Sequence, residues 1–233
     1  MNPHPGLDED FLGALRRRRG GREHLFDTLD PSATAFVVID MQNAFVDTDS
    51  PLAVPTAAAI VPAINRIAGA CRDAGAVVVW IRSTFGPRGR RSWPLYFSEF
   101  APGRGGEALR AMFYPDADGH RFFADLDRGG SDFVVDKNRF SPLASGSSDL
   151  ESRLESLHID TLVIGGTLTN VCCESTMRDA MMRDYRCVLV EDACAARSDE
   201  EHVAALRNAA SYFGDVRRAD DVVALLDGSN TIR

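Results

Sequence analysis

Short, uninterrupted runs of apolar and often β-branched residues recur along the chain and predict its strands. Five runs are long enough to assign, and a short sixth strand is expected near Val216; the five are 35–40, 76–81, 133–136, 161–166 and 187–192. A continuous apolar run, unlike an alternating one, is typical of a parallel strand that is buried on both faces. The pattern therefore predicts a sheet that is covered on both sides.

Between these runs, apolar residues return at helical spacing. The predicted helices are 56–73, 149–157, 170–184, 199–213 and 220–226, with shorter ones near 106–112 and 119–126. Strands that alternate with helices predict an α/β fold: a three-layer α/β/α, doubly wound domain with a six-stranded, mainly parallel sheet. We expect this domain over 32–233. A polar N-terminal arm over 1–31 precedes it, and its arginines at 16–19 are expected to be solvated or to clasp another subunit.

The composition is that of a globular protein with an acidic surface. The chain has 45% hydrophobic and 26% charged residues, and its formal net charge is −8. The charge argues against binding to nucleic acid or to an anionic membrane, and no apolar run reaches the roughly 18–20 residues of a membrane span. The N-terminus lacks the apolar core of a signal peptide, and the five cysteines have no paired spacing. We therefore expect a reduced, cytoplasmic protein.

Lys137 is the single lysine among 26 basic residues, and it follows the third predicted strand. Two other reactive side chains hold similar positions: Asp40 ends the first strand, and Cys172 begins the helix after the fourth. Taken singly, each has an ordinary interpretation as a turn residue, a surface lysine or a buried thiol. Ligands of doubly wound sheets bind beyond the carboxyl ends of the strands, so together the three residues indicate one site at that edge.

These three residue types suit nucleophilic catalysis. The thiolate is the reactive form of cysteine, and a helix N-terminus and a nearby ammonium both favour it. Asp40 is placed to accept the thiol proton and later to pass it to a leaving nitrogen. Backbone N–H groups of the turn GGTLTNVC suit an oxyanion hole, and no serine in a GxSxG setting competes. The residues predict an acyl-transfer hydrolase with a cysteine nucleophile.

Three blocks of sequence carry a resemblance to a known family. They are FVVIDMQNAFVD at 36–47, VDKNRFSPL at 135–143 and GGTLTNVCCESTMRDAMMRDYRCVLVEDACAA at 165–196. Over about 35–226 the chain resembles the isochorismatase-like cysteine hydrolase superfamily, and it is most similar to the ureidoacrylate and N-carbamoylsarcosine amidohydrolase type. This resemblance implies an isochorismatase-like hydrolase domain, and a homodimer or homotetramer.

The resemblance also implies roles for particular residues. The superfamily's Asp, Lys and Cys triad falls on Asp40, Lys137 and Cys172. Its cis peptide bond falls between Thr167 and Leu168, which implies an oxyanion hole from the backbone N–H groups of Leu168 and Cys172.

The remaining cysteines are expected to be structural. Cys172 is the fourth residue of TNVC and matches the nucleophile, whereas Cys173 is expected to pack in the core. Cys71, Cys187 and Cys194 lie in a predicted helix, a strand and a strand end, and are expected to be inert.

The cysteine favours hydrolysis of a C–N bond (amide, ureido or carbamoyl) through a thioester, with release of ammonia or an amine. Isochorismatases, which cleave a vinyl ether, lack the cysteine; ether hydrolysis stays open as an alternative, as does a non-catalytic binding role. Nicotinamidases add a metal site with an Asp-x-His pair and a further histidine near the second strand, but residues 82–91 (RSTFGPRGRR), directly after that strand, contain no histidine. We expect no metal and no cofactor, because the histidines fit no ligand spacing; they are His4, His24, His120, His158 and His202. A surface position is expected for His120.

The resemblance implies a substrate that is a small molecule carrying a carboxylate. The candidate pocket residues offer apolar walls and one amide; they are Asn43, Phe45, Trp93, Tyr96 and Phe140. Arg82 and Arg88 are candidates to hold the carboxylate. FSPL after the lysine departs from the commoner YSAF or YSGF, so the pocket is expected to differ from those of the relatives.

Overall fold

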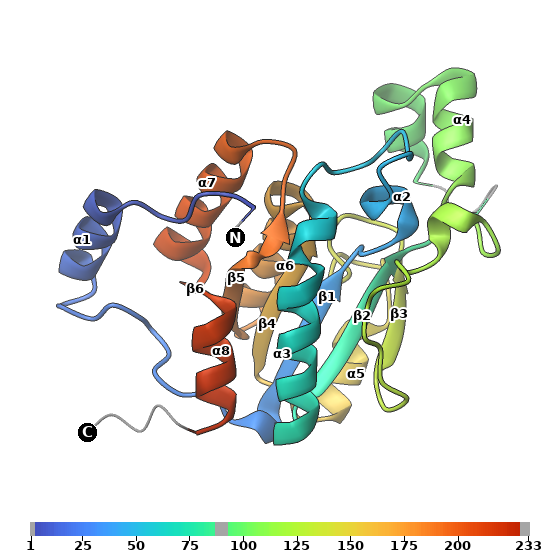
Figure 1. Ribbon diagram of the computed structural model, residues 1–233. Helices are drawn as coiled ribbons and strands as arrows, with labels where there is room; N and C mark the ends of the chain where they lie inside the picture. The colour runs from blue at the N-terminus through green and yellow to red at the C-terminus, as the bar shows by residue number, and fades with distance from the viewer. Residues whose placement is uncertain (1–2, 87–92, 229–233) are drawn as a thin grey trace.

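The computed structural model describes residues 3–86 and 93–228, and these form one α/β domain around a central sheet (Figure 1). Six strands pair in parallel throughout, in the order β3-β2-β1-β4-β5-β6. Their bounds are β1 Thr34–Ile39, β2 Val77–Ser83, β3 Phe133–Lys137, β4 Thr161–Thr167, β5 Arg186–Ala195 and β6 Asp215–Arg217. The predicted three-layer, doubly wound fold with a six-stranded sheet is confirmed.

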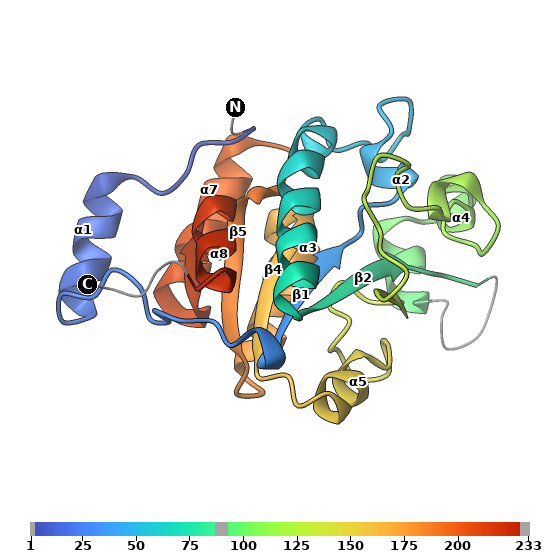
Figure 2. The same ribbon diagram turned by 60° about the horizontal axis from the view of Figure 1, so that its bottom comes forward.

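Helices cover both faces of this sheet (Figures 1 and 2). On one face α3 (Val61–Ala74) and α8 (Ala219–Leu226) pack on Phe36 and Val38 of β1. On the other face, Val37 and Ile39 belong to a core that also contains residues of three helices, α5 (Leu150–Ser156), α6 (Glu174–Met181) and α7 (Asp199–Asn208). Alternate residues of one strand thus enter two separate cores, which explains why the strands are apolar throughout.

The strand order places a reversal of winding direction between β1 and β4. From β1 the chain moves outward to β2 and β3, then crosses back to β4 and moves outward again to β5 and β6. The carboxyl ends of β1 and β4 lie side by side, with Ile39 paired to Gly166. Such a reversal opens a crevice for ligands at that edge of an α/β sheet.

Most predicted helices are present, but some consist of an α-helix joined to a short 3-10 or π-helical turn. The helix expected over 56–73 consists of a 3-10 turn, η2 (Ala57–Ile60), followed by α3, which ends at Gly75 in a left-handed conformation (φ 83°). The helix expected near 106–112 is α4 (Gly103–Ala111).

The prediction of a helix over 119–126 is wrong. Only a short turn, η5 (Asp118–His120), is present there. The residues after it are held extended against the chain that follows β1: the Phe123 N–H donates to the Met41 carbonyl (3.0 Å) and the Asn43 N–H to the Arg121 carbonyl (2.8 Å). These inter-segment bonds use the backbone groups that a helix would need.

The N-terminal segment is partly helical, and three of its four expected solvated arginines, Arg16, Arg17 and Arg18, are exposed. It contains α1 (Glu9–Arg18), capped by the Asp8 carboxylate on the Phe11 N–H, and α1 lies beside the body of the domain (Figure 1). Arg19 forms a buried ion pair with Asp215 of β6 (2.9 Å). An arginine paired inside its own chain is not available to a partner. No helix in the described part of the chain is long and apolar enough to cross a membrane.

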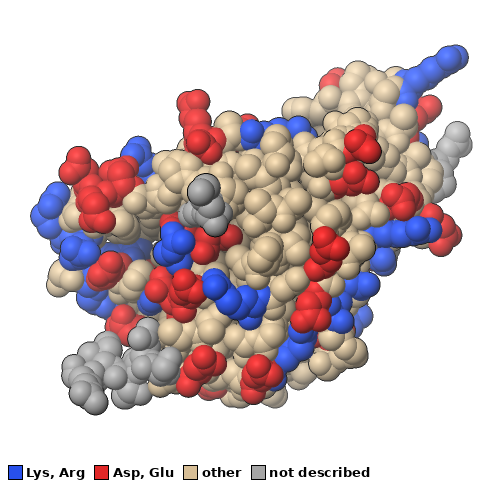
Figure 3. All heavy atoms as spheres, in the orientation of Figure 1, with Lys and Arg blue, Asp and Glu red and all other residues tan. Residues whose placement is uncertain are grey.

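Acidic and basic side chains are intermixed over the face shown in Figure 3. The described part of this face therefore has no continuous basic surface of the kind that binds nucleic acid.

Candidate active site

The structure brings Asp40, Lys137 and Cys172 together at the carboxyl edge of the sheet. Asp40 follows β1, Lys137 ends β3, and Cys172 lies in η6 (Thr169–Cys173), the π-helical turn between β4 and α6. Lys137 Nζ lies 2.8 Å from Asp40 Oδ2 and 3.7 Å from Cys172 Sγ. All three residues are buried, with relative exposures of 0%, 1% and 6%. Three groups that are 35 or more residues apart in sequence thus form one cluster at the winding reversal.

Ser83 is a fourth member of this cluster that sequence reasoning missed. Its hydroxyl donates to Asp40 Oδ1 (3.0 Å) and accepts from Lys137 Nζ (2.9 Å), so that it joins the carboxylate to the ammonium. Lys137 also donates to the Arg139 carbonyl (3.1 Å). The feature that could have identified Ser83 from sequence is its position as the last residue of β2, the strand between those that carry Asp40 and Lys137.

Gln42 holds the backbone of Ser83 in place through hydrogen bonds. Its amide oxygen accepts from the Ser83 N–H (2.8 Å), and its amide nitrogen donates to the Ser83 carbonyl (3.1 Å) and to the His120 carbonyl (3.0 Å). Gln42 is fully buried, so these bonds replace the water that its amide loses. Gln42 lies inside the DMQNAF block, but no role was assigned to it from sequence.

Burial and neighbouring charges set the protonation of the cluster. Burial raises the pKa of the Cys172 thiol; Lys137 opposes this rise without reversing it, and Asp40 adds to it. Burial by itself lowers the pKa of Lys137, but the Asp40 carboxylate and Cys172 raise it above its ordinary value. These directions favour a charged Lys137 and a protonated Cys172 thiol before substrate binds. The helix N-terminus and the ammonium were expected to favour the thiolate; burial and the Asp40 carboxylate oppose it, because a thiolate would be a second buried anion beside Asp40.

The turn that carries Cys172 has an unusual backbone. The peptide bond between Thr167 and Leu168 is cis. The Leu168 carbonyl accepts from the N–H groups of Val171 and Cys173 (both 3.1 Å), which closes the turn tightly. Gly166 just before it has φ +119°, and a Cβ there would overlap the backbone of Ile39. Only glycine fits this close approach of β4 to β1.

A cavity of about 130 Å³ opens onto the cluster. Cys172, Lys137 and Ser83 line it, together with Leu168 and Val171 of the adjoining turn. Its walls are mainly aromatic; the rings are Phe45, Phe85, Trp93, Tyr96, Phe97, Phe113 and Phe140. Four of these rings were expected from sequence, whereas Phe85, Phe97 and Phe113 were missed because the stretch 82–130 shows no regular apolar period.

Asn43 is not among the lining residues of this cavity, contrary to expectation. It begins α2 (Asn43–Val46), and its side-chain amide donates to Asp118 Oδ2 (3.4 Å) on the exposed surface. The helical turn directs the next ring, Phe45, into the cavity in its place.

Among the described residues, the arginines at the cavity do not include the expected Arg82. Arg139 and Arg197 line it. The Arg139 guanidinium lies 5.1 Å from the centre of the Trp93 ring and donates to the Asn138 carbonyl (2.7 Å). Arg82 instead pairs with Asp136 (2.8 Å) away from this cavity. Arg88 lies outside the described residues.

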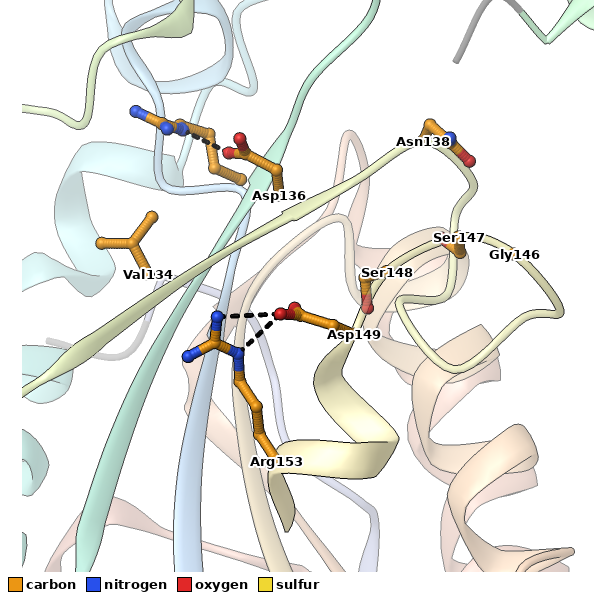
Figure 4. A pocket seen from close by; sticks show the side chains of 9 residues that line it. Val134, Asp136, Asn138, Gly146, Ser147, Ser148, Asp149 and Arg153 are labelled. Atoms are coloured by element: carbon orange, nitrogen blue, oxygen red, sulfur yellow. Dashed lines mark hydrogen bonds and ion pairs between the residues drawn. The ribbon is translucent and has the colours of Figure 1, made fainter. Parts of the chain in front are cut away.

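Arg82 belongs to a larger, open cavity of about 610 Å³ at the edge strand β3 (Figure 4). Both of its arginines are already paired, Arg82 with Asp136 and Arg153 with Asp149 (2.8 Å each). Neither Cys172 nor Lys137 lines it. The reactive groups therefore belong to the smaller cavity.

Three histidines are buried in the structure, and His120, expected at the surface, is one of them. Its ring forms a hydrogen bond with the Thr84 hydroxyl (2.8 Å), and burial lowers its pKa. Within residues 3–86 and 93–228, no group of three or more His, Cys, Asp or Glu side chains is arranged to hold a metal ion. All five cysteines are buried and free, and Cys173 is fully enclosed in the core.

Comparison with known proteins identifies the class of protein that this fold and cluster define. The family model described as the isochorismatase domain matches residues 34–221, and the chain belongs to this family.

Curated relatives and solved structures similar to this chain include hydrolases of particular types. The chain is 32% identical over 214 residues to a ureidoacrylate amidohydrolase RutB of Pseudomonas savastanoi pv. phaseolicola, covering 83% of each chain. It is 30% identical over 199 residues to that of Methylobacterium radiotolerans, covering 80% of this chain and 76% of the relative. A cysteine hydrolase from Pseudomonas syringae pv. phaseolicola superposes with a TM-score of 0.78 at 26% identity, covering 87% and 96% of the two chains.

An N-carbamoylsarcosine amidase from Thermoplasma acidophilum superposes with a TM-score of 0.65 at 26% identity, covering 80% of this chain and 96% of the other. The protein is thus an enzyme of the amidohydrolase type within the isochorismatase family, which confirms the resemblance predicted from its motifs.

Proposed function

We propose that the protein is a cysteine-dependent amidohydrolase that cleaves an amide, ureido or carbamoyl C–N bond of a small molecule through a thioester. The observation that carries this proposal is the position of Lys137, between Asp40 (2.8 Å) and Cys172 (3.7 Å) at a cavity lined by the sulfur. This arrangement pairs a nucleophile with a base and holds both with one cation.

In the first half of the reaction, Asp40 accepts the thiol proton as Cys172 Sγ attacks the substrate carbonyl carbon. The negative charge then moves to the carbonyl oxygen, where the backbone N–H groups of Leu168 and Cys172 are the donors that the motif implies. Asp40 returns the proton to the nitrogen as the C–N bond breaks. The products are a thioester on Cys172 and free ammonia or an amine.

In the second half, water attacks the thioester carbonyl and gives a proton to Asp40. Collapse of the tetrahedral intermediate breaks the C–S bond, and the proton passes from Asp40 to the sulfur. The acid is released, and the neutral thiol of the resting enzyme is restored. Lys137 keeps its charge throughout, so at each step it offsets the single anion on Asp40, sulfur or substrate.

The lining of the cavity favours a small substrate with a carboxylate. Aromatic walls suit a flat or apolar acyl portion, and the guanidinium groups of Arg139 and Arg197 suit a carboxylate. Two of the similar proteins are named for ureidoacrylate and N-carbamoylsarcosine. We propose a substrate of this general kind and no cofactor.

The resemblance further supports a homodimer or homotetramer in the cytoplasm. Leu95 and Phe100 beside the cavity are exposed, at 65% and 76%, and supply apolar area for such contacts. Light scattering coupled to gel filtration measures the oligomer.

The test is release of ammonia or amine from a panel of small amides, ureido acids and carbamoyl amino acids, without added metal. Wild type and Cys172→Ala are compared, and trapping of an acyl-enzyme on Cys172 is followed by mass spectrometry. Turnover and an adduct in the wild type alone are expected. Equal turnover by Cys172→Ala, or turnover without an adduct even in rapid quench, contradicts the cysteine mechanism.

A further inference from the structure

The segment before α1 reaches across the domain to the loop after β5. Within it, the His4 side chain is buried at 4% exposure. Its Nδ1 lies 2.7 Å from Asp199 Oδ1, and its Nε2 lies 2.8 Å from Thr56 Oγ1. The Ala196 N–H donates to the same Nε2 (3.2 Å). One imidazole therefore bonds the N-terminal segment to two others that are distant in sequence, one at Thr56 and one at 196–199.

The donors around the ring assign its tautomer. A backbone N–H can only donate, so Nε2, which faces the Ala196 N–H, acts as an acceptor. Nδ1 then carries the proton and donates to the Asp199 carboxylate. Neutral His4 is both an acceptor for one side of the loop and a donor to the other.

The loop held in this way contributes to the candidate active site. Ala196 and Asp199 flank Arg197, whose side chain lines the cavity beside Cys172. Arg197 is itself exposed, so its position depends on the backbone on either side of it. His4 bonds to both of those flanking residues.

A second route leads from His4 to the turn that carries the sulfur. The His4 ring stacks on His202 of α7, with centroids 4.5 Å apart and planes 20° from parallel. His202 Nδ1 lies 2.9 Å from the hydroxyl of Thr169, the first residue of η6, and both residues are fully buried. Two contacts thus connect His4 to the turn that carries Cys172.

The segment has its own anchors on the domain. The Glu191 carboxylate accepts from the Leu7 N–H, and it lies so close to Gly6 that a Cβ there would be 2.8 Å from Oε2. Asp8 forms an ion pair with Arg207 of α7. Gly6, Leu7 and Asp8 precede position 34, where the family match begins, so the anchored segment lies outside the matched domain.

We propose that residues 3–8 form a strap and that His4 is a positioning residue of the active site. The docked strap holds the Arg197 loop directly and the Cys172 turn through His202 and Thr169. Substrate binding and the geometry of attack then both depend on a segment outside the family domain. The kinetic part of this inference rests on the proposed function; the structural coupling does not.

The experiment compares His4→Ala with Arg19→Ala as the matched control. Arg19 also ties the N-terminal segment to the domain through a buried ion pair, but its partner Asp215 lies on β6, away from the cavity. Loss of Arg19 therefore lowers stability without releasing the Arg197 loop. A third variant, His4→Gln, retains an acceptor within reach of the Ala196 N–H.

Two readouts are taken on the full chain at a temperature where all variants are folded. Hydrogen–deuterium exchange follows peptides that cover 168–174 and 195–200, and kcat and KM are measured on the best substrate of the panel. In His4→Ala we expect at least about tenfold faster exchange in both peptides. The hydrogen bonds of His4, which must break before these peptides open locally in the wild type, are absent from the variant. We expect kcat/KM to fall at least about tenfold, since a misplacement of about 1 Å can cost about 100-fold.

Arg19→Ala should match the wild type in both readouts, and His4→Gln should recover part of both. Unchanged exchange in His4→Ala overturns the strap. Faster exchange with unchanged kcat/KM overturns the positioning role. Absence of turnover in the wild type across the panel contradicts the proposed function alone, and the exchange data then decide whether the strap holds the turn.

Discussion

The ammonium of Lys137 lies 2.8 Å from Oδ2 of Asp40, and both residues are buried. Burial raises the pKa of the neighbouring Cys172 thiol, and under the proposed mechanism this thiol loses its proton as it attacks the substrate carbonyl. A buried ion pair of this kind is costly to break because removal of one partner leaves the other unpaired. The pair therefore fixes both the geometry and the protonation of the site.

Lys137→Arg should abolish turnover although it conserves charge. Lys137 is 1% exposed and contacts Asp40, Ser83 and the Arg139 carbonyl at once, and a planar guanidinium cannot reproduce that compact arrangement. We expect kcat/KM to fall by about 1000-fold or more, on the scale of about 10²–10⁴ for lost acid–base catalysis. Arg66→Lys, at an exposed position of α3, is the control, and its kcat/KM should equal that of the wild type. Near wild-type activity of Lys137→Arg would refute the assignment of the triad.

Ser83→Ala tests the bridge between the carboxylate and the ammonium. The variant loses two hydrogen bonds to charged groups, each of a kind that contributes about 1.5–3 kcal/mol. We expect kcat to fall by about 10- to 100-fold, which is about 1.4–2.7 kcal/mol, with a smaller change in KM. Ser152→Ala on exposed α5 is the matched control. If kcat of Ser83→Ala equals that of the wild type, the bridge does not contribute to catalysis.

His202 should make the fold sensitive to acid. Burial lowers the pKa of His202 from 6.5 to about 4, so between these values the unfolded chain binds a proton that the folded protein does not. The stability associated with neutral His202 is fully present above pH 6.5 and is lost as the pH falls toward 4. Urea unfolding at pH 7, 5.5 and 4.5 should show a smaller loss for His202→Gln than for the wild type. The same pH dependence in both proteins would exclude His202 as the source.

Two glycine substitutions should have opposite effects on stability. Gly166→Ala places a Cβ against the backbone of Ile39 at φ +119°, which strains the contact between β1 and β4. We expect a loss of about 3 kcal/mol or more, as for severe backbone strain or overpacking. Gly69→Ala in the middle of α3, where the space is open, should instead stabilise by about 0.5–1 kcal/mol. Chemical denaturation checks both, and equal effects of the two changes would contradict the close approach.

Sequence reasoning found the reactive groups more readily than the groups that support them. Asp40, Lys137 and Cys172 carry distinctive chemistry at strand ends, so their position along the chain indicated a shared site. Ser83 and Gln42 are common polar residues, and their roles depend on which side chains face them across the sheet. Their bonds join positions 41 to 54 residues apart, and such pairings cannot be read from local pattern.

The aromatic cavity and the N-terminal segment also depend on tertiary contacts that the local sequence pattern does not predict. The rings of 82–130 follow no helical or strand period, so only their packing decides that Phe85 and Phe113 reach the cavity while Asn43 does not. Apolar residues in the N-terminal arm were too few to predict docking, yet His4 is buried and bonded to three residues in two distant segments.

The sequence by itself predicted the layered α/β architecture, the family and the three residues that cluster at the carboxyl edge of the sheet, because strand burial and motif spacing can be read from the local order of residues. Tertiary structure alone decided the hydrogen bonds of Ser83 between Asp40 and Lys137, the shape of the cavity and the burial of His4. Each of these depends on distances and burial between groups remote in the chain. Electrostatic energies and hydrogen bonds change steeply with such distances, whereas the hydrophobic pattern that directs folding does not encode them.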